Sequence, residues 1–224
     1  MNCFVDTNVP IAFIFRIDPL NHYANSVFKF YDSIFWSHRV KNECEKVFDQ
    51  KLNLLNVFYK NLLKDLNNNL FNELHSNEFS FENLIGYLKK KEHNKKQFKN
   101  IESSLNIFWD KYVNETFPSF ENFKTAITLC LQDLKFQSFK RKKYWKKNVI
   151  YTEKRIEKYD HLRLILQNLG VHHPDDEIIL DAHDYNLKTS FNLDFVTFDK
   201  KCYNGAIHSN LSFHDIKNKQ DFIF

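Results

Sequence analysis

Short runs of β-forming residues, each followed by an acid, stand near both ends of the chain. Residues 3–5 (CFV) precede Asp6, and residues 194–198 (DFVTF) precede Asp199. Runs of this length that are rich in β-branched and aromatic residues are typical of buried strands. Two further runs predict strands in the same regions of the chain, residues 31–36 (YDSIFW) and residues 211–216 (LSFHDI).

Most of the remaining chain has apolar positions every three or four residues, which is the period of an α-helix. The pattern predicts a helix over 8–16, with a proline in its first turn. The segment after Ser37 predicts one long helix or two in series, and only helical patterns and loops fill 68–150. Toward the C-terminus we expect a helix over 153–169 and another that begins at 174–176 (PDD). The expected helix ends are Ser37, Ser80 and Ser119 as N-caps and Gly170 as a C-cap.

The alternation of strands and helices at both ends predicts an α/β fold, with a central parallel sheet flanked by helices. We expect one domain over 1–224 and a mostly helical insertion within it, at about 65–150. Only 3 Gly and 4 Pro occur, which argues against an all-β sandwich or barrel that needs many tight turns.

The composition narrows the setting of the protein. No run of about 18 apolar residues is present, so we expect no transmembrane helix and no membrane partner. The N-terminus lacks the basic and apolar regions of a secretory signal. The four cysteines have no C-x-x-C spacing, which favours a reduced, cytoplasmic setting. The net charge of +4 is too small to establish a nucleic-acid partner by itself.

Four acidic residues are placed where a parallel sheet could bring them together. Asp6 and Asp199 follow strands, and ligands of open parallel sheets bind beyond the carboxyl ends of the strands. Glu43 follows the second predicted strand, and Asp176 begins a late helix. A single strand-end acid is more often a helix cap or a solvated turn residue, so the set carries the hypothesis. Carboxylates in one cleft repel one another, and Mg²⁺ or Mn²⁺ would relieve that repulsion and support phosphodiester cleavage.

The order of these acids resembles the PIN-domain nuclease family, which includes the toxins of VapBC-type toxin–antitoxin pairs. FVDTNVPIAF, around Asp6, is similar to the opening strand–Asp–helix signature of that family. Residues 37–43 (SHRVKNE) resemble its Ser…Glu stretch, and 176–182 (DEIILDA) resemble its Asp-x-x-Ile-x-x-Ala helix start. Residues 195–199 (FVTFD) resemble its closing strand. The resemblance covers about 1–50 and 170–216, and the insertion has no counterpart in a minimal PIN domain.

The resemblance implies a metal-dependent endoribonuclease that leaves a 5′-phosphate and a 3′-hydroxyl. One or two Mg²⁺ or Mn²⁺ ions would be held by Asp6, Asp176 and Asp199. Glu43 would bind directly or through water, and Asp181, which departs from the small residue usual there, is a weaker candidate ligand.

Some of these assignments have alternatives in the sequence itself. Glu45 and Asp175 are acidic neighbours of the second and third acids, although the Ile178-Ile179 pair fits Asp176 better in register. Asn8 and Thr197 are expected to orient carboxylates or phosphate by hydrogen bonds, or else to cap the strand ends.

A basic stretch at 135–158 holds ten Lys and Arg residues with interleaved aromatics. Lysine and arginine neutralise phosphates, and exposed aromatic rings stack on unpaired bases. The alternative is a solvated helix face whose aromatic residues are buried. The residues expected to bind nucleic acid are Lys140, Arg141, Lys142, Lys143, Lys146 and Lys147.

Two other functions fit the same residues. A catalytically inactive PIN-fold module would bind RNA without cutting it. A structure-specific DNA nuclease of the flap type carries more acids in its cleft, and Asp181 keeps that reading open. RNA is the expected substrate, and PIN-domain proteins often form homodimers or, as toxins, pair with an antitoxin.

Overall fold

The computed structural model describes residues 1–68, 79–91, 95–189, 193–208 and 217–219. The chain divides into two compact units. The first contains residues 1–14, 20–48 and 141–224, and the second contains 15–19 and 49–140. The second unit therefore starts earlier and ends earlier than the insertion expected at about 65–150.

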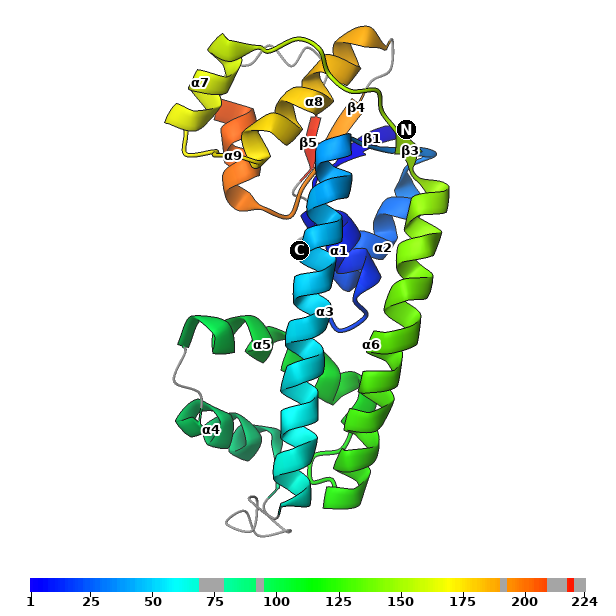
Figure 1. The fold of residues 1–224 in the computed structure, drawn as a ribbon, viewed down its shortest axis with the longest axis vertical. Helices are drawn as coiled ribbons and strands as arrows, with labels where there is room; N and C mark the ends of the chain where they lie inside the picture. Colours follow the sequence, from blue (N-terminus) through cyan, green and yellow to red (C-terminus); the bar gives the residue numbers. More distant parts are fainter. Residues whose placement is uncertain (69–78, 92–94, 190–192, 209–216, 220–224) are drawn as a thin grey trace. The chain divides into compact units, whose positions relative to one another are not determined.

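The first unit is built on a sheet of five parallel strands, in the order β3-β2-β1-β4-β5 (Figure 1). The central strands β2, β1 and β4 are mostly apolar and mostly buried, as expected of parallel strands covered on both faces, whereas β3 is exposed and β5 is polar. The α/β class expected from the sequence is confirmed. The strands are β1 (Asn2–Val5), β2 (Ser33–Trp36), β3 (Ile150–Tyr151), β4 (Leu193–Val196) and β5 (Lys217–Lys219).

Helices connect these strands, as parallel pairing requires. In the first unit α7, α8 and α9 pack successively near β4 and β5, and α1 packs on α2 (Figure 1). Trp145, which is 1% exposed, packs against the rings of Phe13, Phe28 and Trp36 and ties the end of α6 to the sheet. These helices are α1 (Asn8–Ile14), α2 (Asn21–Phe30), α7 (Asp160–Asn168), α8 (Asp175–Lys188) and α9 (Lys200–His208).

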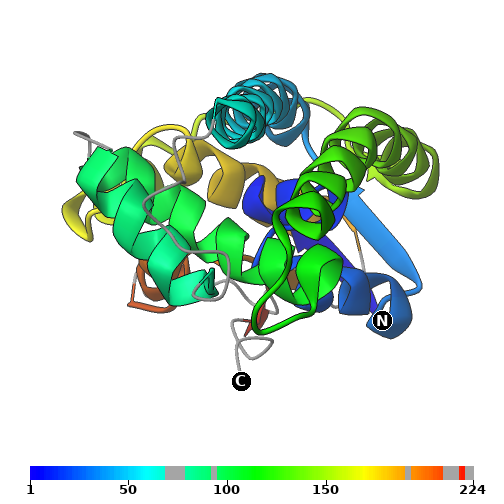
Figure 2. The same cartoon turned by 90° about the horizontal axis from the view of Figure 1, so that it is seen from below.

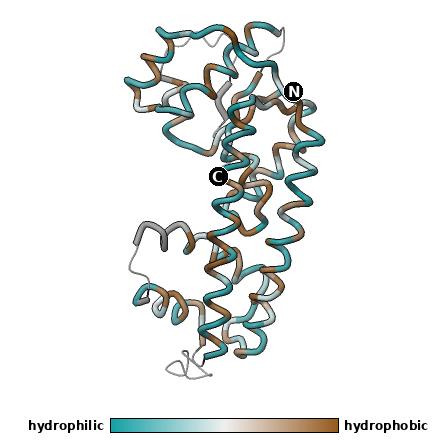
Figure 3. Tube along the Cα trace, viewed as in Figure 1, coloured by the Kyte–Doolittle hydropathy of each residue, from teal (hydrophilic) through white to brown (hydrophobic). Residues whose placement is uncertain are grey.

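The second unit is helical in its described residues. Figure 2 shows α3 and α6 nearly end-on, with α4 and α5 next to each other. Hydrophobic and hydrophilic turns alternate along α3 in Figure 3, as expected of an amphipathic helix. The core of this unit is aromatic, with Phe79, Phe108, Trp109 and Phe123 in mutual ring contact. Its helices are α3 (His38–Asn67), α4 (Phe81–Lys91), α5 (Lys95–Phe108), the π-helical turn η2 (Trp109–Val113) and α6 (Phe120–Asn148).

The expected helix ends are confirmed. The hydroxyl oxygen of Ser80 accepts a hydrogen bond from the Asn83 N–H (3.3 Å), and that of Ser119 accepts one from the Asn122 N–H (3.1 Å). Ser37 caps α3, a single helix rather than two in series. Gly170 follows α7 with a φ of 82°, a conformation that glycine adopts at little cost.

The helix expected over 153–169 is wrong at its start, because α7 begins only at Asp160. The preceding residues 152–159 form no helix. Arg155 in this segment is buried and donates hydrogen bonds to Glu177 and Asp181 of α8, contacts that hold the segment against that helix. The helix α2 was not expected, and it has no side-chain N-cap that could have signalled it. The strand expected at 211–216 lies outside the described residues.

No helix in the described ranges is long and apolar enough to cross a membrane.

Candidate acidic active site

The carboxyl ends of four strands lie at one level of the sheet. Val5 is in register with Val196, Phe4 with Phe35, and Trp36 with Tyr151. The residues that follow β1, β2 and β4 therefore leave the sheet at the same edge, as expected for ligand-binding residues of a parallel sheet.

Asp6 is held at this edge by hydrogen bonds from residues that directly follow β1 and β4. Its Oδ1 accepts from the Thr7 N–H (2.6 Å), and its Oδ2 accepts from Asn8 Nδ2 (2.6 Å) and Thr197 Oγ1 (2.8 Å). Asp6 is 3% exposed. Asn8 also accepts from the Phe198 N–H (3.0 Å), so it links the ends of β1 and β4. The orienting role expected for Asn8 and Thr197 agrees with these contacts.

Glu43 reaches the same edge from α3. Thr7 Oγ1 donates to Glu43 Oε2 at 2.7 Å, so the residue after Asp6 orients the second acid. The alternative Glu45 is used elsewhere, in ion pairs with Lys142 and Lys146. Although burial opposes the shift, these two lysines lower the pKa of Glu45.

Asp199 lies two residues beyond Thr197, immediately before α9. Its Oδ1 accepts from the N–H groups of Lys201 (2.6 Å) and Cys202 (3.0 Å), and its own N–H donates to Thr197 Oγ1 (3.0 Å). Asp199 is thus the N-cap of α9, a structural role that is common for an acid after a strand, and its side chain is exposed. The cap uses Oδ1 and fixes the position of the carboxylate at this edge of the sheet.

The structure favours Asp175 over Asp176 as the third acid. Charges on Glu43 and Asp199 act directly on Asp175, and Asp175 in turn acts on Asp6. Asp176 is 1% exposed and accepts from Gln167 Nε2 (2.8 Å) and the Glu177 N–H (2.8 Å).

Consecutive residues of a helix point about 100° apart, so the two aspartates face different directions. The charge cluster favours Asp175, and the role expected for Asp176 stays a prediction.

The site holds concentrated negative charge. Burial, followed by the nearby Asp175 and Glu43 carboxylates, raises the pKa of Asp6 to about 7, against the opposing hydrogen bond from Thr197. Burial and the charges of Glu43 and Asp199 raise the pKa of Asp175 to about 6. These shifts are the expected result when partly dehydrated carboxylates lie close to one another.

Asp181 is not placed as a metal ligand. It is 5% exposed and its Oδ1 accepts from Arg155 Nε (2.9 Å) and Arg39 Nη1 (3.2 Å). Glu177 forms ion pairs with the same two arginines and with Arg163 Nε (2.6 Å). The weaker ligand role expected at Asp181 stays a prediction, and the arginines that neutralise its charge disfavour it.

The basic stretch divides into structural and exposed residues. Arg141 donates to the Phe13 carbonyl (2.7 Å) and to Asn25 (2.6 Å), and its guanidinium lies 4.2 Å from the Phe13 ring centroid. Lys142 pairs with Glu45 and lies over the Phe48 ring. Both make contacts within the protein, which disfavours their expected role as nucleic-acid contacts. Lys146 is paired but partly exposed, whereas Lys140, Lys143 and Lys147 are exposed and remain candidates.

The donor set fits a hard divalent cation by its chemistry. All four acids supply oxygen, the ligand type that Mg²⁺ and Mn²⁺ prefer. In the part of the chain that the structure describes, no three His, Cys, Asp or Glu side chains stand close enough to form a ready-made metal cage. Mg²⁺ needs no such cage, because it keeps several waters and binds through one or two carboxylates.

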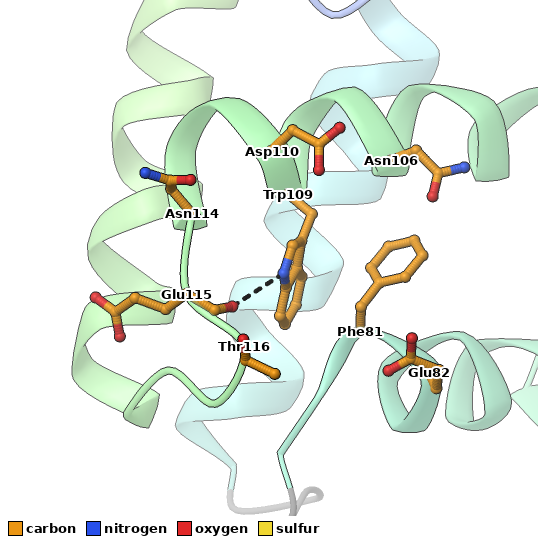
Figure 4. Close-up of a pocket in the computed structure, with 8 residues that line it drawn as sticks. All are labelled: Phe81, Glu82, Asn106, Trp109, Asp110, Asn114, Glu115 and Thr116. Carbon is orange, nitrogen blue, oxygen red and sulfur yellow. Dashed lines mark hydrogen bonds between the residues drawn. The ribbon is translucent and has the colours of Figure 1, made fainter.

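The second unit contains a cavity of about 530 Å³ (Figure 4). Trp109 lines it and donates from Nε1 to the Glu115 carbonyl (3.1 Å), with the Phe81 ring 5.3 Å away. Glu82, Asp110 and Glu115 also line the cavity. These acids would repel a phosphate, so this cavity is not suited to a nucleic-acid backbone.

Comparison of the chain with protein-family models, with curated proteins and with solved structures finds no match.

Proposed function

We propose that this protein is a metal-dependent endoribonuclease with a PIN-like fold. The acids that act are Asp6, Glu43, Asp175 and Asp199, and the cofactor is Mg²⁺ or Mn²⁺. The observation that carries the proposal is the charge cluster at the carboxyl edge of the sheet, where Asp6 is buried and accepts hydrogen bonds from neutral donors. The resemblance to PIN-domain motifs supports RNA as the substrate.

The chain's own residues prepare the site. Asn8 and Thr197 hold the Asp6 carboxylate in one orientation, and Thr7 does the same for Glu43. A divalent cation bound here would supply activation of water and neutralisation of the phosphate charge. Asp199, fixed by the start of α9, presents its exposed carboxylate at the mouth of the site. The cytoplasmic setting, the homodimer and the antitoxin partner stay predictions from the sequence.

The test is cleavage of unstructured RNA, structured RNA and DNA with Mn²⁺, Mg²⁺ or EDTA. Wild type should cut RNA only with a metal, and Asp6→Asn should abolish cutting because it keeps size while removing the charge that a cation needs. Asp49→Asn is the matched control, since Asp49 is an exposed acid on α3. It should cut as wild type does.

Three outcomes would contradict the proposal. Equal cutting by wild type and Asp6→Asn would remove the metal mechanism. RNA binding without any cutting would favour the inactive binding module. A preference for branched DNA would favour the flap-type nuclease.

A further inference from the structure

An exposed aromatic pair stands at the same edge of the sheet as the acids. Tyr151, the last residue of β3, is 47% exposed. The imidazole of His38, the first residue of α3, meets its ring edge-on, with centroids 6.3 Å apart and planes at 88°. His38 Nδ1 and Tyr151 Oη are 2.6 Å apart and hydrogen-bonded.

The pair is held in place although it faces solvent. Asn42 Nδ2 lies 2.8 Å from His38 Nε2, one helical turn further along α3. Lys41 Nζ lies 5.3 Å from the centroid of the Tyr151 ring. A hydrogen-bonded chain from α3 to the ring, with an ammonium beside it, pre-organises a flat surface next to a positive charge.

This platform, defined as His38, Lys41, Asn42 and Tyr151, continues into the acidic site. Tyr151 is in register with Trp36 of β2, and β2 pairs with β1. Neighbouring strands are about 4.8 Å apart, so the end of β3 lies about 10 Å from the end of β1, where Asp6 follows. On α3, Glu43 is the residue directly after Asn42.

We infer that the platform is a base-binding subsite for an unpaired strand. One base stacks on Tyr151, Lys41 neutralises an adjacent phosphate, and the strand runs along the sheet edge to the acids. The inference rests on the proposed function and names its substrate class, single-stranded RNA. A duplex is not accepted, because its base faces are already stacked within the helix.

The first test is binding of a labelled single-stranded RNA without metal, measured by fluorescence anisotropy. Tyr151→Ala should weaken binding about 5- to 160-fold, which corresponds to the loss of one base–aromatic stack. Tyr151→Phe should keep most of the affinity, since it keeps the ring and loses only the hydroxyl. Duplex RNA should bind all variants equally weakly.

The matched control is Phe30→Ala. Phe30 is 53% exposed and ends α2, just before β2 begins, so it lies in the same unit but toward the edge of the sheet opposite the acids. Its removal should leave binding unchanged. Equal affinity of wild type and Tyr151→Ala, with both folded by circular dichroism, would overturn the inference, as would an equal loss in Phe30→Ala.

The second test separates the inference from the proposed nuclease activity. A single abasic nucleotide is moved along an RNA, and cleavage with Mn²⁺ is measured for each position. Wild type should slow at one fixed distance from the cut, and Tyr151→Ala should be slow at every position. Cleavage that does not depend on the abasic position would contradict the base-binding subsite but leave the proposed nuclease activity supported. If nothing is cut, the proposed function fails and the binding comparison alone decides the subsite.

Discussion

Two faces of helix α8 hold acids in opposite electrostatic environments. In its first turn, Asp175 is half-buried and lies near other carboxylates, and burial with the charges of Glu43 and Asp199 raises its pKa to about 6. Glu177 and Asp181, which are buried and four residues apart on another face of the helix, are surrounded by arginines. Burial acts to raise the pKa of Glu177, yet the Arg163, Arg155 and Arg39 side chains hold it below its usual value.

The difference separates acids whose charges are paired within the protein from the acids of the proposed site. Glu177 and Asp181 have their charges neutralised within the protein, so nothing external is needed there. Asp6 accepts hydrogen bonds from neutral donors, and Asp175 lies near other carboxylates. A cation from solution would relieve the repulsion between these negative charges. Perturbation of pKa values in this direction, at the edge where ligands of parallel sheets bind, is what supports an active site.

The largest effect on stability is expected from removing an arginine that pairs with Glu177 and Asp181. Arg155→Met should destabilise the protein by about 3–5 kcal/mol, because it leaves Glu177 and Asp181 buried with fewer partners. Thermal or urea unfolding measures the change. Lys154→Met, which removes an exposed neighbouring cation, should change stability little. Similar unfolding curves for the two variants would show that the network does not stabilise the fold.

The opposite signs of the pKa shifts predict a stability maximum in mildly acidic solution without metal. The raised pKa of Asp6, from 3.8 to about 7, makes the folded state bind more protons, so stability falls as pH rises through that range. The lowered pKa of Glu177 means that its stabilisation is lost as pH falls below 4.5. Melting temperatures measured with EDTA from pH 3 to pH 8 test both effects. A melting temperature that rises steadily to pH 8 would contradict the effect expected from Asp6.

A smaller effect is expected at Asp6, which lies beside Asp175 in the acidic cluster. Asp6→Asn should not destabilise the metal-free protein at neutral pH, and should stabilise it by about 1 kcal/mol, because it removes a charge repelled by its neighbours. Its unfolding in EDTA, compared with wild type, gives the sign directly. A loss of several kcal/mol would mean that Asp6 is mainly structural.

The smallest effect separates the lysines of the basic stretch. Lys142→Met should cost up to about 1 kcal/mol of stability through its lost ion pair with Glu45, and leave RNA binding unchanged. Lys143→Ala should leave stability unchanged and lower the salt slope of RNA binding by about 1. Reversal of these two outcomes would contradict the division into structural and exposed residues.

Much of the fold was predictable because its signals are local. Asp6 follows a run of apolar residues, and Ser80, Ser119 and Gly170 have the chemistry of helix ends, so strands and caps were placed from neighbours in the sequence. The helix α2 lacks such a cap, and it was missed.

The candidate site was only partly predictable because its assignments depend on direction and on distant partners. Two adjacent aspartates, 175 and 176, are equal in composition, and only the helix geometry shows which one joins the charge cluster. Asp181 had the chemistry of an additional ligand, but Arg39 and Arg155, far away in the chain, lie beside it. The Tyr151 platform depends on the pairing of a two-residue strand, which leaves almost no pattern in the sequence.

Titration of Mn²⁺ by calorimetry tests the central claim most directly, with wild type, Asp6→Asn, Asp175→Asn and Asp176→Asn compared under one condition. We expect wild type to bind Mn²⁺, Asp6→Asn and Asp175→Asn to lose this binding, and Asp176→Asn to retain most of it. Equal Mn²⁺ binding by all four proteins, or none by wild type, would contradict the assignment of this sheet edge as a metal site.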